Sequence, residues 1–369
     1  MMRTLVAALV TLGDPGTLSG GYLYHRRLAE LAAEQDARLV FVSVPQRPFP
    51  LAVLDAPWVL RAARRRAAQV LVLDSIAAAY LGPWLALFGP PLPMVGMLHQ
   101  PPGGIDHAPV RTGVQAVLDR LAYRRAQRLL VASDLLATQI RRMVARPERV
   151  FVLPPGRDVA ATAAEPPEHV RRGRRAAFLS VGNWVERKGL LSLLEAFARL
   201  EPRAAMLHLV GETRSEPRYA ERVRTRLAEA DLTERVVVHG PLSTQEVAAL
   251  YGACDAFVLP SLKEPYGTVY GEAMAYGLPV VGWRAGNLPY LADHEREGLL
   301  IRIGDIERLS DAMRRLADDP ALRRRLGDNA RRRAETRPTW RDVAQRFFEH
   351  LREVFLASEI RRVGGERFG

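Results

Sequence analysis

Short apolar runs alternate with longer amphipathic stretches along almost the whole chain. This alternation is the βαβ pattern, in which buried parallel strands are connected by helices. Strands are expected at residues 4–10, 39–44, 70–73, 94–98, 129–132 and 150–153 in the first half, and at 177–181, 206–210, 236–238, 256–259 and 278–281 in the second. The pattern predicts an α/β chain with two parallel sheets.

The length and one irregular segment indicate where the domains divide. A chain of 369 residues exceeds the size of one domain, which is roughly 100 to 200 residues. After Pro154-Pro155-Gly156 the sequence is rich in Ala, Pro, Glu and Arg and loses its apolar period, which predicts a linker at residues 161–176. We expect Rossmann-like domains at 1–160 and 177–338, and a C-terminal helix at 339–369 that returns toward the first domain.

Charge and cysteine content narrow the class of partner. The formal net charge of +12 comes mainly from arginine and favours phosphates, acidic sugars, anionic lipid or nucleic acid. No DNA- or RNA-binding motif occurs, so nucleic acid is not expected as a partner. Cys254 is the only cysteine, which excludes a disulfide or a cysteine zinc site within the chain and fits a reducing compartment.

Two apolar segments resemble membrane signals without satisfying their requirements. The apolar start lacks a small-residue cleavage site, and the stretch at 81–98 contains four prolines, so we expect a cytoplasmic protein without a membrane span. The apolar Trp58 is followed by four arginines, Arg61, Arg64, Arg65 and Arg66. This is the pattern of a helix that contacts anionic lipid at the inner membrane face. A solvated helix face is the alternative, and the pattern alone favours it.

The densest cluster of candidate site residues follows the strand at 256–259 and reads PSLKEPYGTVYGEAMAYGLPVVG. Gly267, Thr268 and Val269 should present free backbone N–H groups at a helix start, which suits a phosphate. Glu264 lies in the preceding loop and Glu272 inside the helix. Each carboxylate can accept hydrogen bonds from vicinal hydroxyls such as those of ribose or hexose rings.

This segment resembles the C-terminal domains of glycosyltransferase family four, whose pattern is PS-x-x-E-x-(F/Y)-G-x-x-x-x-E-A-M-A-x-G-x-P-V-V. The resemblance continues through AGNLPYLADHEREGLLIRIGD, covers residues 178–334 well and is weaker before the linker. It implies the GT-B fold, with two Rossmann-like domains facing an interdomain cleft, an N-terminal acceptor domain and a C-terminal donor domain. It also implies that Glu264 contacts the transferred sugar, Glu272 the nucleotide ribose, and the amides of 267–269 the diphosphate.

A second candidate group follows the strand at 177–181 and reads SVGNWVERKGL. Lys188 lies after a strand and before a helix, where a cation can neutralise a leaving diphosphate. A surface lysine is the alternative. Many members of glycosyltransferase family four carry Arg directly after the glycine of this segment, whereas this chain has Asn183 there. We expect Arg187 to supply the missing charge.

Three further places carry candidate ligand contacts. Gly20 and Gly21 lie between the first strand and its helix, where glycine lets backbone approach a ligand. His99 follows the strand at 94–98 and can donate to a sugar hydroxyl or a developing phosphate charge. The resemblance places Gly20, Gly21 and His99 near the donor. It places the loop His239-Gly240-Pro241-Leu242 at the nucleotide base. A plain turn and a structural histidine are the alternatives.

The resemblance implies a retaining hexosyl transfer from a nucleotide-diphosphate sugar to a hydroxyl of a glycan, glycolipid or small metabolite. No D-x-D triplet occurs in the chain, so no metal and no other cofactor is expected. A nucleotide-sugar hydrolase or epimerase on the same fold remains a rival, as does a non-catalytic nucleotide-sugar-binding module. A nicotinamide oxidoreductase is disfavoured because the G-x-G-x-x-G fingerprint is missing.

Overall fold

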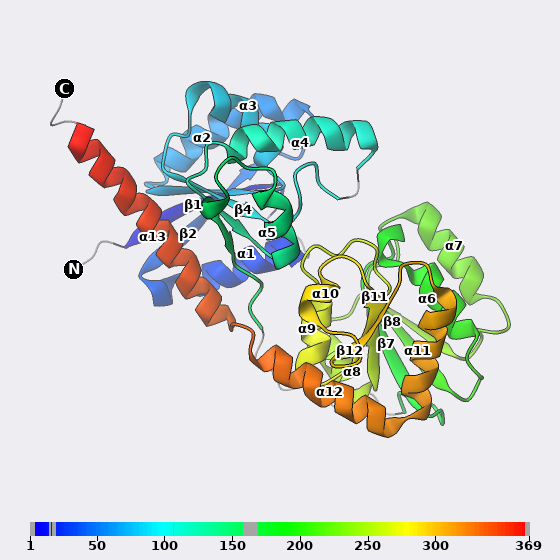
Figure 1. Ribbon diagram of the computed structural model, residues 1–369. Helices are drawn as coiled ribbons and strands as arrows, with labels where there is room; N and C mark the ends of the chain where they lie inside the picture. Colours follow the sequence, from blue (N-terminus) through cyan, green and yellow to red (C-terminus); the bar gives the residue numbers. More distant parts are fainter. Residues whose placement is uncertain (1–3, 15, 17–19, 106, 158–168, 366–369) are drawn as a thin grey trace. The chain divides into compact units, whose positions relative to one another are not determined.

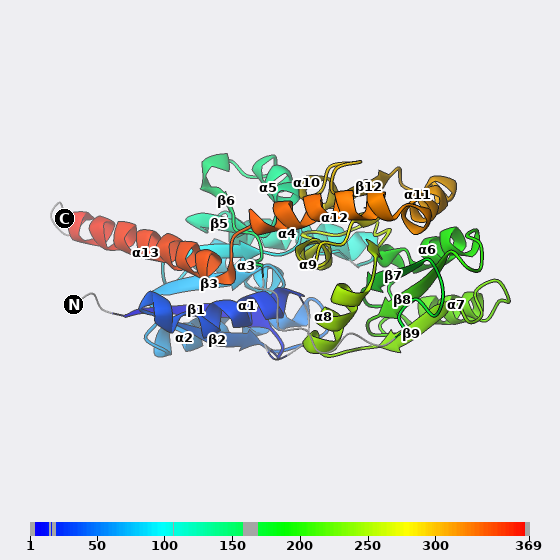
Figure 2. The same cartoon turned by 90° about the horizontal axis from the view of Figure 1, so that it is seen from below.

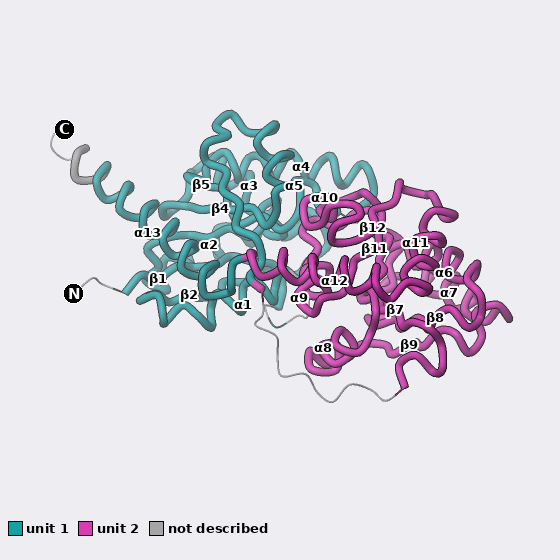
Figure 3. Tube along the Cα trace, turned by 60° about the horizontal axis from the view of Figure 1, so that its bottom comes forward, with its two compact units in different colours: residues 1–156, 338–369 teal, residues 157–337 magenta. Residues whose placement is uncertain are grey.

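The computed structural model describes residues 4–14, 16, 20–105, 107–157 and 169–365 (Figure 1). The chain forms two compact units, which are considered separately below (Figure 3). Unit 1 comprises Met1–Gly156 and Pro338–Gly369, and unit 2 comprises Arg157–Arg337. Residues 161–168 of the expected linker lie outside the described residues.

Unit 1 contains a parallel six-stranded sheet in the order β2-β1-β3-β4-β5-β6. Its strands are β1 Leu5–Leu12, β2 Ala37–Val44, β3 Val70–Asp74, β4 Met94–Leu98, β5 Arg128–Val131 and β6 Val150–Val152. Its helices are α1 Gly20–Glu30, α2 Ala56–Arg65, α3 Ala78–Phe88, α4 Pro109–Tyr123, α5 Asp134–Arg141 and α13 Trp340–Gly365, with short 3₁₀ turns η1 Ala33–Gln35, η2 Leu51–Asp55 and η3 Pro147–Arg149.

Both faces of this sheet are covered by helices (Figure 1). Successive side chains of a strand point to opposite faces, so Val70 and Val72 pack toward α1 and α13, whereas Leu71 and Leu73 pack toward α2 to α5. Since both faces are buried, the strands are mostly apolar, although the edge strand β2 carries the exposed Arg38 and Ser43. The last helix of the chain, α13, is therefore part of the core of unit 1.

Unit 2 contains a second parallel six-stranded sheet, in the order β12-β11-β10-β7-β8-β9. Its strands are β7 Ala176–Val181, β8 Ala205–Val210, β9 Val236–Gly240, β10 Ala256–Val258, β11 Val280–Trp283 and β12 Gly298–Ile301. Its helices are α6 Leu190–Ala198, α7 Pro217–Leu227, α8 Thr244–Ala253, α9 Thr268–Ala275, α10 Leu288–Leu291, α11 Ile306–Asp318 and α12 Pro320–Glu335, with the 3₁₀ turn η4 Glu186–Lys188. Helices α6, α7 and α11 cover one face, and α8 and α9 the other (Figure 2).

Each sheet reverses its strand order at one place. In unit 1 the chain passes from β1 to β2 on one side and then adds β3 on the other side of β1. In unit 2 it passes from β7 to β8 and β9, then adds β10 on the other side of β7. Ligands of open parallel sheets bind outside the carboxyl ends of the strands at such a reversal. The two places to examine are therefore the ends of β1 and β3 and the ends of β7 and β10.

The structure confirms the predicted α/β class and all the expected strands, with shifts of at most two residues at the ends. β11 begins at Val280 rather than at residue 278, and β12 was not predicted. Among the described residues, none of the helices combines the length and apolar character needed to cross a bilayer.

Candidate functional site

The reversal point of unit 2 holds a buried ion pair. Nζ of Lys188, at the end of η4, lies 2.5 Å from Oε2 of Glu264 in the loop after β10. Both side chains are about 10% exposed. A buried charge is unfavourable unless it is paired, and each of these two groups provides the other with a partner. The two residues that the sequence analysis placed in one site are in direct contact.

Two glycines let Lys188 reach this position. Gly189 has φ +70°, and a Cβ there would lie 2.1 Å from the carbonyl oxygen of Pro260, so only glycine allows the two loops to approach. A Cβ on Gly182 would lie 3.4 Å from Cδ and Cε of Lys188. The aliphatic part of the lysine therefore lies against bare backbone at the end of β7.

Lysine is rare in this chain. Of the 53 basic residues, two are lysines, Lys188 and Lys263, and the rest are arginine. A lysine side chain is a flexible stem that ends in a compact ammonium, whereas arginine ends in a planar guanidinium.

The loop that carries Glu264 is fixed from behind by the segment after β11. The backbone N–H of Asn287 donates to the carbonyl oxygen of Glu264 at 2.8 Å, and Asn287 Nδ2 donates to the carbonyl oxygen of Tyr266 at 3.0 Å. Gly286, with φ +57°, lies so close that a Cβ would be 2.8 Å from the backbone of Glu264. The sequence analysis did not name Asn287 as a site residue. Asn287 can hold the loop of Glu264 because Gly286 lets the two backbone segments approach closely.

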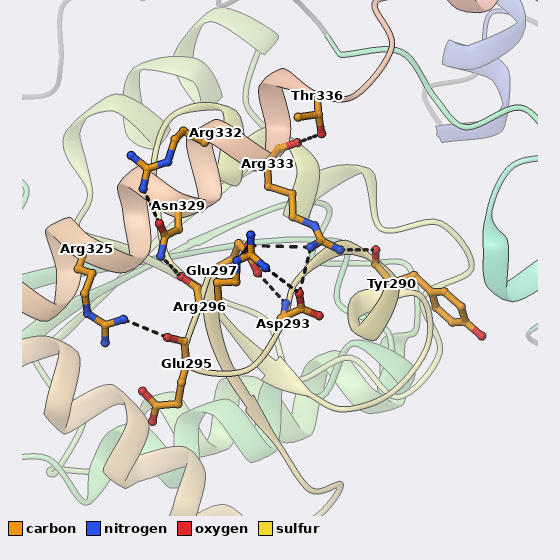
Figure 4. Close-up of polar contacts among 10 residues, drawn as sticks. All are labelled: Tyr290, Asp293, Glu295, Arg296, Glu297, Arg325, Asn329, Arg332, Arg333 and Thr336. Carbon is orange, nitrogen blue, oxygen red and sulfur yellow. Dashed lines mark hydrogen bonds and ion pairs between the residues drawn. The ribbon is translucent and has the colours of Figure 1, made fainter.

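A polar network ties the same segment to α12 (Figure 4). Arg333 donates to Asp293 Oδ2 at 3.1 Å and to the carbonyl oxygen of Tyr290 at 3.3 Å. Glu297 is buried and accepts from the backbone N–H of Asp293 at 2.8 Å. These contacts hold residues 290–297 against a helix, so the chain that follows Asn287 is anchored.

The helix start expected to bind phosphate is formed as predicted. α9 begins at Thr268, with Gly267 in the left-handed conformation (φ +70°) as its N-cap. No side chain caps this helix, so its first N–H groups, including those of Thr268 and Val269, are available to an anion. The hydroxyl of Thr268 is buried without a hydrogen-bond partner among the described residues.

Glu272 lies one turn further along α9 and is half-buried. Its Oε2 accepts a hydrogen bond from the hydroxyl of Tyr251 at 3.1 Å. Tyr251 is almost fully buried, and burial raises the pKa of its hydroxyl well above the usual value, so it stays a neutral donor. The contact orients the carboxylate and identifies Tyr251 as a supporting residue that the sequence pattern did not indicate.

Arg187 and Asn183 come from the same segment between β7 and α6 as Lys188. Arg187 Nη1 donates to the carbonyl oxygen of Lys263 at 3.2 Å. Asn183 is exposed, and its Oδ1 accepts from the backbone N–H of Glu212 at 3.2 Å. Asn183 therefore stabilises the junction between β7 and the loop after β8, and Arg187 lies next to the loop of Glu264.

The expected base-binding residues lie at the far end of the sheet. His239 and Gly240 are the last residues of β9, and Leu242 packs against the core on the α8 side. His239 Nε2 lies 3.0 Å from Nδ1 of His208, whose Nε2 lies 2.8 Å from the carbonyl oxygen of Val170. Since a carbonyl only accepts, His208 carries its proton on Nε2 and accepts from His239. The His239 ring is thus engaged within the protein.

The reversal point of unit 1 holds a different group of polar side chains. His99 follows β4, and its Nε2 lies 2.9 Å from Nε2 of His25 on α1. Asp74 ends β3, and its Oδ2 lies 3.8 Å from Nδ1 of His25 and accepts from the hydroxyl of Thr11 at 2.7 Å. The sequence analysis named His99 alone, because the other members come from elements far apart in the chain.

All these side chains are buried, and burial sets their charge. It lowers the pKa of both His25 and His99 to about 3, so both rings are neutral near pH 7. Burial also raises the pKa of Asp74. Within the described part of the chain, His25, Asp74 and His99 form the one cluster of three side chains close enough to share a metal ion.

Gly20 and Gly21 belong to the first turn of α1 rather than to the loop before it. Gly21 lies against the ring of His99, because a Cβ there would be 3.7 Å from Cδ2 of the imidazole. Residues 17–19, just before them, lie outside the described residues.

Comparison with known families identifies the chain. Residues 162–333 match the family of glycosyl transferases group 1, and residues 2–156 match the glycosyl transferase 4-like domain. Together the two matches cover both units. Both models describe glycosyltransferases, and the chain belongs to the glycosyltransferases of this group.

Curated relatives include the MMP alpha-(1->4)-mannosyltransferase of Mycolicibacterium hassiacum, 35% identical over 61% of this chain and 53% of the relative. The D-inositol 3-phosphate glycosyltransferase of Saccharomonospora viridis is 31% identical over 63% of this chain and 57% of the relative. The chain thus spans a little over half the length of these relatives.

Solved structures establish the fold. Sucrose-phosphate synthase from Thermosynechococcus elongatus is similar with a TM-score of 0.82, at 22% identity, over 96% of this chain and 100% of that one. Anabaena HepE, determined in complex with UDP and glucose, has a TM-score of 0.78 at 20% identity, over 95% of this chain and 100% of that one. The fold is therefore GT-B, as the sequence resemblance implied.

Proposed function

We propose that this protein is a retaining glycosyltransferase that moves a hexosyl group from a nucleotide-diphosphate sugar to a hydroxyl of an acceptor. The observation that carries the proposal is the buried pair of Lys188 and Glu264, beside the uncapped start of α9 at the reversal point of the sheet. A cation and free amides suit a diphosphate, and a buried carboxylate suits sugar hydroxyls.

In the proposed reaction the bond between the anomeric carbon and the diphosphate breaks, and the acceptor oxygen bonds to the same face of that carbon. The acceptor proton passes to a phosphate oxygen of the departing group. Lys188 exchanges its contact with Glu264 for the diphosphate as negative charge develops there, and the amides of Thr268 and Val269 share that charge. Glu264 then holds hydroxyls of the sugar and Glu272 those of the ribose.

Relatives support the nature of the donor. Anabaena HepE has been determined with UDP-glucose, and one curated relative is a mannosyltransferase. We infer that the donor here is likewise a nucleotide sugar and that Gly20, Gly21 and His99 of unit 1 contact the transferred sugar or acceptor. The positive groups named above supply charge that a divalent ion supplies in other transferases, so no metal is required.

A donor panel tests the proposal. A ligand that binds only the folded protein raises its melting temperature, so one nucleotide-diphosphate sugar should stabilise the protein more than its nucleoside monophosphate does. With that donor and an acceptor library, NMR of the product should show the anomeric configuration of the donor. Free sugar formed at the same rate with and without every acceptor would favour the hydrolase, and binding without turnover would favour the non-catalytic module.

We further propose that unit 1 contacts an anionic membrane at its cytoplasmic face through α2 and the end of α3. Leu54, Trp58 and Phe88 are 69–72% exposed, which is unusual for such large apolar side chains. Trp84 stacks on Phe88 and donates to the carbonyl oxygen of Val53, so the end of α3 lies against η2, the turn that leads into α2. Arg61 and Arg65 continue the exposed face of α2 at helical spacing.

Co-sedimentation with vesicles tests this contact. Vesicles with phosphatidylglycerol should pellet the protein at low salt, and the double variant Arg61→Glu with Arg65→Glu should remain in the supernatant. Arg324→Glu with Arg332→Glu on α12 changes the net charge equally and should still pellet. Equal loss in both variants would mean that net charge, rather than this surface, causes binding.

A further inference from the structure

A pocket in unit 1 lies between α4 and α5, which cover the same face of the sheet (Figure 1). Its volume of about 380 Å³ is within the roughly 300–1,000 Å³ of small-molecule sites. The lining extends from Pro102, in the loop after β4, to Ala126 and Arg149, which precede β5 and β6. The polar side chains described at the reversal point of unit 1 do not line it, so this pocket is a separate place.

The lining is rich in positive charge. It contains four arginines and no acidic side chain, and the arginines are Arg120, Arg124, Arg146 and Arg149. The acid next to Arg120 in sequence, Asp119, is buried outside the lining and accepts from the backbone N–H of Gly103 at 2.8 Å. Positive charge that is gathered in a concave place without a carboxylate attracts an anion.

The ends of helices offer these arginines another role, because the last carbonyl groups of a helix attract cations. Arg149 is partly used within the protein, since its Nη1 donates to the carbonyl oxygen of Ala126 at 3.4 Å. The side chains of Arg120, Arg124 and Arg146 make no hydrogen bond or ion pair with the rest of the chain that the structure describes. Their guanidinium groups therefore keep their N–H donors for a ligand.

Most of the remaining lining is apolar. Tyr123, Leu129 and Ile140 are at most 4% exposed and belong to the core under α4 and α5. Met143, in the same lining, is 47% exposed. An inorganic anion leaves this apolar surface in water, whereas a ligand with an apolar part covers it, which is favourable. The lining thus suits a molecule that combines a negative charge with an apolar part.

We propose that this pocket binds an amphiphilic anion, namely a phosphate ester whose alcohol part is apolar. Arg120, Arg124 and Arg146 donate charge-assisted hydrogen bonds to the phosphate. Met143 covers the apolar part. The site goes beyond the proposed transfer reaction and does not depend on it. Two sources share this chemistry, an anionic phospholipid of a membrane and a soluble phosphate ester.

Calorimetric titration with three probes tests the chemistry of the ligand. Hexyl phosphate carries charge and chain, inorganic phosphate carries the charge alone, and 1-hexanol carries the chain alone. At low salt, hexyl phosphate should bind at least about tenfold more tightly than either of the others, since burial of about two methylene groups accounts for that factor. Equal affinity for hexyl phosphate and inorganic phosphate would overturn the proposal.

Two double variants locate the site. Arg124→Gln with Arg146→Gln removes two charges from the pocket at exposed positions, so the protein should fold normally and bind hexyl phosphate at least about tenfold more weakly. Arg26→Gln with Arg38→Gln removes the same charge at exposed positions of α1 and β2, outside the lining, and should bind like the wild type. Equal affinity of the two double variants would contradict the proposed site.

Vesicles that contain phosphatidylglycerol distinguish the two sources. If a phospholipid is the natural ligand, Arg124→Gln with Arg146→Gln should pellet less with these vesicles than Arg26→Gln with Arg38→Gln does. If a soluble ester is the ligand, both double variants should pellet alike, while the first still loses its affinity for hexyl phosphate. Retained affinity of the first for hexyl phosphate would overturn the proposal for either source.

Discussion

In unit 1 the strand order reverses beside Thr11 and Asp74, and in unit 2 it reverses beside Lys188 and Glu264. The first place is occupied by two neutral histidines and a carboxylate, all buried. The second is occupied by an ion pair beside an open helix start. The same topological position therefore carries neutral, directional hydrogen bonding in one unit and concentrated charge in the other.

The difference indicates which part of a sugar nucleotide each unit suits. In the proposed reaction the diphosphate meets positive charge from Lys188 and from the start of α9 that is fixed before the bond breaks. Hydroxyl groups need hydrogen-bonding partners of defined direction, and a neutral imidazole offers one donor and one acceptor. The following experiments challenge this division, in order of decreasing expected effect.

Removal of the cation should have the largest effect. Lys188→Ala should lower kcat by about 10² to 10³, or about 2.7–4 kcal/mol of transition-state stabilisation. Lys263→Ala, which removes the other lysine of the chain from an exposed position, should leave kcat within about twofold. Steady-state rates with saturating donor measure both. Near-normal turnover of Lys188→Ala would remove this residue from the mechanism.

The close approach of two loops in unit 2 gives the next effect. Gly189→Ala puts a Cβ into the carbonyl of Pro260 at a positive φ, so the free energy of unfolding should fall by about 2–5 kcal/mol. Gly252→Ala on α8 meets open space and should raise it by about 0.5–1 kcal/mol. Urea unfolding measures both. Equal effects would mean that the contact between Gly189 and Pro260 is not tight.

The buried histidines of unit 1 predict a dependence of stability on pH. Between pH 6.5 and 3 the unfolded chain binds protons on His25 and His99 that the folded chain does not. The free energy of unfolding therefore falls as the pH drops, by up to about 1.4 kcal/mol per pH unit for each histidine. The raised pKa of Asp74 acts in the opposite direction and offsets part of this.

Hydrogen exchange in β3 and β4 across this range measures that dependence. His25→Leu should remove the contribution of one histidine and flatten the slope accordingly. An unchanged slope in this variant would show that His25 is charged in the folded protein.

Chelation should have the smallest effect. In the proposed mechanism Lys188 and the amides of α9 provide the positive charge, so EDTA should leave the transfer rate unchanged within error. A rate that EDTA abolishes and Mg²⁺ or Mn²⁺ restores would show that the charge in unit 2 is insufficient alone.

Much of the fold was predictable because parallel strands buried on both faces are apolar over their whole length. That signal located β4 at residues 94–98 without error. β12 was not predicted because an apolar run of four residues, Gly298–Ile301, does not by itself distinguish a strand from part of a helix. The predicted start of β11, at residue 278, was two residues too early, because an apolar run does not show where hydrogen bonding with the neighbouring strand begins.

The site was predictable where its residues follow strands, and was not where they meet through tertiary packing. Glu264, Gly267 and Lys188 each follow a strand or begin a helix, so local pattern indicated them. His25 lies 74 positions from His99, and nothing local distinguishes it from other helix residues. Tyr251 is linked to the candidate site by the contacts of its hydroxyl with Glu272 and with the carbonyl oxygen of Val269. The structure brings these partners together, and the sequence pattern could not.

The most direct test of the account is calorimetric titration of the best nucleotide-diphosphate sugar into the wild type, Lys188→Ala and Lys263→Ala. The account predicts that Lys188→Ala binds at least about tenfold more weakly, because a charge-assisted contact contributes about 1.5–3 kcal/mol, and that Lys263→Ala binds like the wild type. Equal affinity in all three proteins would contradict the claim that the reversal point of unit 2 binds the diphosphate.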